Sequence, residues 1–227
     1  MPAYFSDKSF KFLRALARSN TRDWFDAHRG DYEAQLRQPA LRLIADLQPD
    51  LAGISSQFRA DPKPVGGSLF RIHRDTRFSN DKTPYKTHLG AWFFHARRRE
   101  VEAPGFYLHV EPGRSFVGAG LWHPQPDTQR RIRQFLHDNP AGWKAATRAP
   151  AFRKRFAMDG ESLVRPPRGF PPDHELIEDL KRKSFVATTT LDDASVLGPR
   201  LRATVADRFA ALGPLVDYLC AALDLEF

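Results

Sequence analysis

The spacing of apolar residues changes twice along this 227-residue chain, and that change constrains the fold more than any other feature. In the first fifty residues apolar side chains recur every three or four positions, which is typical of amphipathic helices. Between residues 68 and 121 the period is two, as where Phe106, Leu108 and Val110 alternate with Tyr, His and Glu. The helical spacing then returns, most clearly from Leu201 to Leu223.

The central alternating region predicts a sheet. Short turns such as Pro112-Gly113 connect its strands, and strands joined by short turns pair antiparallel. The run 164–172 holds four prolines and a glycine, so it predicts a loop rather than a regular element. We expect one α+β domain over residues 1–227, with a central antiparallel sheet of about four to five strands flanked by N- and C-terminal helices. Strands are predicted at 70–73, 89–96, 106–111, 115–121 and 184–190.

Composition excludes several classes of protein. The single cysteine, Cys220, excludes an intrachain disulfide and a multi-cysteine zinc site. The polar N-terminus lacks the layout of a signal peptide. No run approaches the ~20 apolar residues that span a bilayer. We therefore expect a cytoplasmic protein without a membrane partner.

The basic residues are concentrated in one part of the chain. The formal net charge is +8, and residues 61–100 hold nine Lys and Arg against four Asp and Glu, which leaves +5 in that segment. A charge of this sign is typical of proteins that bind nucleic acid or anionic small molecules.

A cluster of charged side chains between residues 71 and 86 is the candidate site. Cations this close repel one another unless an anion neutralises them, and arginine suits phosphate or carboxylate because its donors form a planar fork. We predict that Asp75 acts as a general base or orienting carboxylate and Tyr85 as a hydrogen-bond donor. The predicted anion-binding residues are Arg71, Arg74, Arg77, Lys82 and Lys86.

Two other interpretations of the cluster stay open. Asp75 and its neighbouring arginines can form an ion-pair network that only stabilises a hairpin, with Phe78 and Tyr85 as packing residues. The same surface, together with the basic runs 97–99 and 153–155, can instead bind nucleic acid. The residues do not decide whether the chain is an enzyme.

Histidines near the expected strands raise the question of a metal site. His109 and Glu111 would share one strand face, and so would His73 and Asp75 if the first strand extends that far. No HExxH or comparable fixed spacing is present. The sequence therefore predicts no metal and no cofactor.

The spacing Arg71-x-x-Arg74-Asp75-x-Arg77-Phe78-x-x-x-Lys82-x-x-Tyr85 resembles the signature of a bacterial family known as domain of unknown function 2461. The resemblance covers essentially the whole chain and implies a shared one-domain fold, but it implies no activity. One departure is Ala119, where a third glycine is common. The other matching segments are Asn20-x-Arg22-Asp23-Trp24-Phe25 with Tyr32, Gly105-Phe106-Tyr107-Leu108, and Gly118-Ala119-Gly120-Leu121-Trp122.

Overall fold

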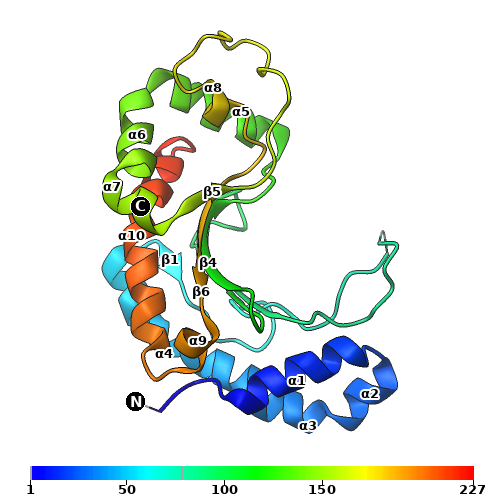
Figure 1. Cartoon of the computed structure of the whole chain (residues 1–227). Helices are drawn as coiled ribbons and strands as arrows, with labels where there is room; N and C mark the ends of the chain where they lie inside the picture. Colours follow the sequence, from blue (N-terminus) through cyan, green and yellow to red (C-terminus); the bar gives the residue numbers. More distant parts are fainter. Residues whose placement is uncertain (1, 78) are drawn as a thin grey trace.

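A single antiparallel sheet forms the centre of the computed structural model, which describes residues 2–77 and 79–227. Within these residues the sheet has six strands in the order β1-β2-β3-β4-β6-β5. Helices from both ends of the chain lie along one face and at the two ends of this sheet, so the predicted α+β class is confirmed (Figure 1). The strands are β1 Phe58–Arg59, β2 Leu89–His95, β3 Gly105–Val110, β4 Ser115–Leu121, β5 Ala157–Asp159 and β6 Phe185–Leu191.

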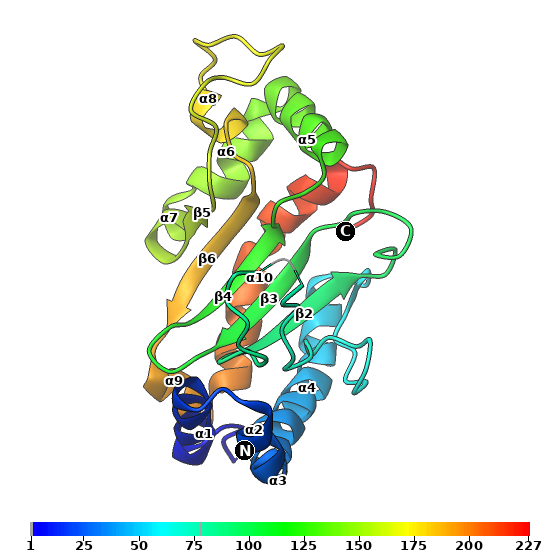
Figure 2. The same cartoon turned by 90° about the vertical axis from the view of Figure 1, so that its right-hand side faces the viewer.

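The two faces of the sheet differ in what covers them. One face carries fully buried side chains such as Phe93 and Phe106, whose rings both lie 5.0 Å from Phe209 of helix α10 (Leu201–Ala221). In Figure 2 this face points away from the viewer, and α10 lies behind the sheet. The opposite face, here called the open face, carries the half-buried Trp92 and Tyr107. The period of two along each strand therefore separates an apolar core from a polar and aromatic surface.

Most of the remaining helices lie at the two ends of the sheet. The short helices of residues 7–37 lie at one end and those of residues 126–180 at the other, whereas α4 (Gln38–Ile54) runs beside α10 and next to β1 (Figure 1). No described helix is long and apolar enough to cross a membrane. Residues 164–172 contain no regular element, as predicted. The other helices are α1 Asp7–Arg18, α2 Arg22–Ala27, α3 Arg29–Tyr32, η1 Glu33–Arg37, α4 Gln38–Ile54, α5 Pro126–Asp138, α6 Pro140–Arg148, α7 Pro150–Arg155, α8 Ile177–Leu180 and α9 Asp193–Leu197.

A π-helical segment, η1, joins α3 to α4 immediately before Pro39. Proline has no N–H, so the carbonyl of Gln35, four residues earlier, cannot receive its usual helical hydrogen bond. The hydroxyl of the buried Ser9 in α1 donates to this carbonyl at 2.7 Å instead. The Gln35 carbonyl thus holds α1 against η1.

Replacing Ser9 by alanine tests this contact. The Ser9→Ala variant is expected to lose about 1–3 kcal/mol of unfolding free energy, because the part-buried Gln35 carbonyl loses this hydrogen bond. Urea denaturation followed by circular dichroism measures the difference. Replacing the exposed Ser56 by alanine serves as the control and should leave the midpoint nearly unchanged.

Residues 69–88 form a long excursion from the sheet, here called the arm. We predicted a strand at its start, and this is wrong: residues 70–73 form only an isolated bridge, between His73 and Tyr85. Pro84 cannot donate the reciprocal bond that would continue the ladder beyond Arg74. Phe78, a predicted packing residue, lies outside the described residues.

The two sides of the arm also differ in length. Three residues lie between the bridged Leu69 and His73, whereas five lie between their partners Tyr85 and Ala91. The two extra residues interrupt the pairing, as in a β-bulge, which bends a strand and re-aims its side chains. His88 lies within this longer side, just before β2.

Candidate functional site

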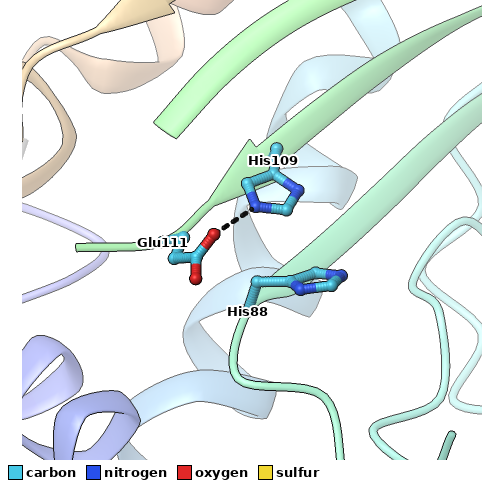
Figure 3. Close-up of side chains that lie close together, drawn as sticks. All are labelled: His88, His109 and Glu111. Carbon is cyan, nitrogen blue, oxygen red and sulfur yellow. Dashed lines mark hydrogen bonds and ion pairs between the residues drawn. The ribbon is translucent and has the colours of Figure 1, made fainter. Parts of the chain in front are cut away.

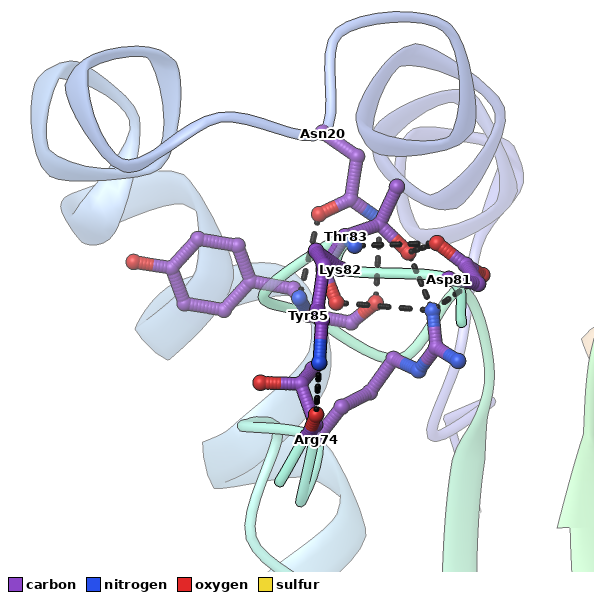
Figure 4. A network of polar contacts seen from close by, with 7 residues as sticks. Asn20, Arg74, Asp81, Lys82, Thr83 and Tyr85 are labelled. Carbon is purple, nitrogen blue, oxygen red and sulfur yellow. Dashed lines mark hydrogen bonds and ion pairs between the residues drawn. The ribbon is translucent and has the colours of Figure 1, made fainter. Parts of the chain in front are cut away.

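The tip of the arm is organised around Arg74. Its Nη1 donates to the carboxylate of Asp81 and to the hydroxyl of Thr83, two short contacts seen in Figure 4. Asp81 also accepts from the backbone N–H of Thr83 at 2.9 Å. The Thr83 backbone N–H, with the Arg74 and Thr83 side chains, lowers the pKa of Asp81 to about 2. Asp81 is therefore an anion at neutral pH and fixes the direction of Arg74.

Asp75 and Arg77 form a separate pair on the outside of the arm. The guanidinium of Arg77 donates through Nε at 3.0 Å and Nη2 at 2.7 Å to the two oxygens of Asp75. These hydrogen bonds lower the pKa of the Asp75 carboxyl group. Both side chains are exposed, and so exposed a pair contributes little to stability. The proposed catalytic role of Asp75 stays a prediction.

Lys86 and Arg71 lie at the base of the arm, beside the sheet. The ammonium group of Lys86 donates to the backbone carbonyl of Arg71 at 2.9 Å and lies 5.2 Å from the ring of Phe70. Burial lowers the pKa of Lys86. The side chain of Arg71 is exposed. The arm therefore separates these two cations from the cations at its tip.

Tyr85 anchors the arm to the N-terminal helices. The side-chain amide of Asn20 donates to the Tyr85 carbonyl at 2.9 Å and accepts from the Tyr85 N–H at 3.0 Å. The buried Tyr85 ring stacks on Phe25 of α2 with centroids 4.1 Å apart. In Figure 4 the ring points away from the Arg74 network. The predicted role of Tyr85 as a donor to a ligand stays a prediction, while its packing role is evident.

A cleft of about 610 Å³ lies between the arm and the α1–α2 connection. Arg74, Lys82 and Tyr85 are the predicted site residues that line it. The other four, Arg71, Asp75, Arg77 and Lys86, do not. Sequence reasoning missed the opposite wall, which comes from residues some 50 positions earlier. The remaining lining residues are Asn20, Thr21, Arg22, Asp26, Arg29, His73, Thr76 and Pro84.

The cleft carries an excess of positive charge. Arg22, Arg29, Arg74 and Lys82 line it, against one carboxylate, Asp26, which already accepts from Arg29 at 2.6 Å. Among the described residues the side chain of Arg22 forms no hydrogen bond or ion pair. The Lys82 ammonium donates only to the backbone carbonyl of Thr76, at 2.9 Å. Two cations of the cleft therefore have no anionic partner within the described chain.

The two basic runs named for the nucleic-acid alternative lie far from each other. Residues 97–99 connect β2 to β3, whereas residues 153–155 precede β5 at the other edge of the sheet. Arg98 packs on the Phe94 ring at 3.4 Å, and Arg155 pairs with Asp207. Nucleic-acid binding by this surface stays an untested alternative.

One group of side chains suited to a metal ion lies outside the cleft. Within the described residues, His88, His109 and Glu111 offer ligand atoms that all lie within 4.8 Å of one another. β3 ends at Val110, one residue short of the expected shared strand face, yet Nε2 of His109 and Oε2 of Glu111 lie 3.1 Å apart. Residues 73 and 75 do not extend a strand, so their shared face is not formed.

Comparison with known proteins yields a family but no activity. The sequence profile of a family described as a conserved hypothetical protein (DUF2461) matches residues 8–218. No curated protein matches the chain. The matched range includes the arm and both walls of the cleft.

Proposed function

The chain belongs to this conserved hypothetical family, and we propose that its cleft binds a small anion bearing phosphate or carboxylate groups. The observation that carries the proposal is the uncompensated charge of Arg22 and Lys82, which face one cleft from opposite walls. A volume of about 610 Å³ suits a small molecule, since ligand pockets typically enclose about 300–1,000 Å³.

The cations of the cleft have two different roles in binding. Asp81 and Thr83 hold Arg74 in place, so its direction is set before a ligand arrives. The side chains of Arg22 and Lys82 are exposed, and they supply positive charge that a ligand can neutralise. Charge-assisted hydrogen bonds from such groups to phosphate or carboxylate are roughly twice as strong as neutral ones.

The experiment is calorimetric titration with inorganic phosphate, pyrophosphate, a sugar phosphate and a dicarboxylate. One of these anions is expected to bind with one-to-one stoichiometry. Arg22→Ala and Lys82→Ala should each weaken binding by about 1.5–3 kcal/mol, the scale of a hydrogen bond to a charged group. Neither change touches a buried residue, so both variants should keep the parent's melting temperature.

Arg99→Ala provides the matched control, because this exposed arginine lies in the β2–β3 connection away from the cleft. It removes the same charge and should bind the anion as tightly as the parent. Equal weakening in Arg22→Ala and Arg99→Ala would mean that only the net charge matters. Unchanged binding in both cleft variants would refute the assignment to this cleft.

A further inference from the structure

The open face of the sheet carries a compact group of His88, His109 and Glu111 (Figure 3). His109 and Glu111 come from β3 and the residue that follows it, and His88 precedes β2. The rings of His88 and His109 lie 4.3 Å apart. The side chains of His109 and Glu111 are 11% and 14% exposed, so little water competes for them.

The topology of the sheet brings the three residues together. His109 pairs in register with Gly90, which has no side chain to separate it from the neighbouring His88. His88 reaches this position through the two additional residues on the longer side of the arm. Bulges that re-aim a side chain are common next to functional sites.

Neighbouring groups contact one ring nitrogen of His109 and one carboxylate oxygen of Glu111. The hydroxyl of Tyr107 lies 3.2 Å from Nδ1 of His109, which leaves Nε2 facing Glu111. Arg114 donates to Oε1 of Glu111 at 2.6 Å, which leaves Oε2 facing His109. Phe116 stacks on the His109 ring with centroids 4.7 Å apart. Metal-binding histidines and carboxylates are typically oriented by such partners on their second atom.

The charge states suit a cation. Burial lowers the pKa of His88 to about 4 and also lowers the pKa of His109, so both rings are neutral at pH 7. The pKa of Glu111 is lowered by its bonds to His109 and Arg114 in spite of its burial. Metal ligation needs neutral imidazoles and an ionised carboxylate. Within the described residues His88 forms no hydrogen bond, so its ring nitrogens are free for another ligand.

We propose that His88, His109 and Glu111 bind a divalent first-row transition metal ion, such as Zn²⁺, Mn²⁺ or Fe²⁺, on the open face of the sheet. Two imidazoles and one carboxylate are a set typical of such ions, and three protein ligands leave positions open for water or a substrate. Their ligand atoms already lie within 4.8 Å of one another. The proposal does not depend on anion binding in the cleft.

The test is titration of the tag-free, chelator-treated protein with Zn²⁺ by calorimetry and with Co²⁺ by visible absorption. One ion per chain is expected to bind, and the visible spectrum of bound Co²⁺ should be that of a coordination site of low symmetry. His88→Ala and Glu111→Gln should each abolish saturable binding of Zn²⁺. Tyr107→Phe should weaken it about 10–100-fold, because it removes a group that orients a ligand. His88 is half-buried, so its removal should leave the fold intact.

His174→Ala is the control, because His174 stacks on His137 at 5.0 Å and provides another histidine pair that can bind Zn²⁺ adventitiously. It should leave the site unchanged, and Arg22→Ala should as well. Zn²⁺ binding that survives in His88→Ala but is lost in His174→Ala would overturn the proposal. Absence of one-to-one binding by the parent would do the same.

Discussion

Phe25→Ala is expected to lose about 3–5 kcal/mol of unfolding free energy, the range for truncating a fully buried phenylalanine. The Phe25 ring is 1% exposed, stacks on Tyr85 at 4.1 Å and packs against Tyr32 at 5.3 Å. Its removal leaves a cavity where α2 meets the arm. Urea denaturation measures the loss, and trypsin cleavage after Arg77 or Lys82 should become faster because the arm loses the stacking of Tyr85 on Phe25.

Phe25→Leu separates the loss of volume from the loss of an apolar contact. Leucine fills part of the cavity, so this variant should be more stable than Phe25→Ala. Phe70→Ala is the control on the arm itself, because its ring is 42% exposed. A Phe25→Ala variant that loses less than about 1 kcal/mol would show that the arm is not docked on α2, since truncating a buried ring costs far more.

Gly120→Ala is expected to destabilise the protein by about 3 kcal/mol, from backbone strain and overpacking together. Gly120 has a φ of +128°, a backbone conformation that residues with a side chain rarely adopt. A Cβ at this position would lie 2.0 Å from the carbonyl oxygen of Phe185. The close approach is between β4 and β6, which pair at Gly120 and Val186. Thermal and urea denaturation measure the effect.

Gly118→Ala is the matched control in the same strand. Its Cβ would lie 3.1 Å from the Ala187 carbonyl oxygen, and its backbone is not in the left-handed region. The expected loss is therefore clearly smaller. Equal losses in the two variants would mean that strand pairing, rather than the position of Gly120, sets the sensitivity. The neighbouring Ala119 has its side chain in the buried core and meets neither constraint.

Most of the sheet was predictable because consecutive residues carry its signal. β3 shows the period of two directly, and the Pro112-Gly113 turn predicts its antiparallel pairing with β4. The segment 184–190 is confirmed as β6. β1 and β5 were not predicted, because two or three residues are too few to show alternation. The strand predicted at 70–73 is wrong because Pro84 and the unequal lengths of the arm's two sides interrupt its ladder.

The candidate cleft was predictable only in part. Arg74 and Lys82 were identified from the local density of charge, whereas Arg22 and Arg29 carry no local sign of facing them. The one signal for that wall was the segment from Asn20 to Phe25 that the family resemblance named. Charge density also could not show that Lys86 lies at the base of the arm, because sequence proximity does not reveal how an extended excursion spreads its side chains.

The sequence by itself determined the class of fold, the succession of N-terminal helices, central strands and C-terminal helices, and the segment in which cations gather. These properties depend on periods and turns that neighbouring residues encode. Only the tertiary structure decided that Asn20 holds Tyr85 across 65 positions and that His88 meets His109 and Glu111. Such contacts arise when separately formed elements pack together, and packing between distant segments leaves no local pattern in the chain.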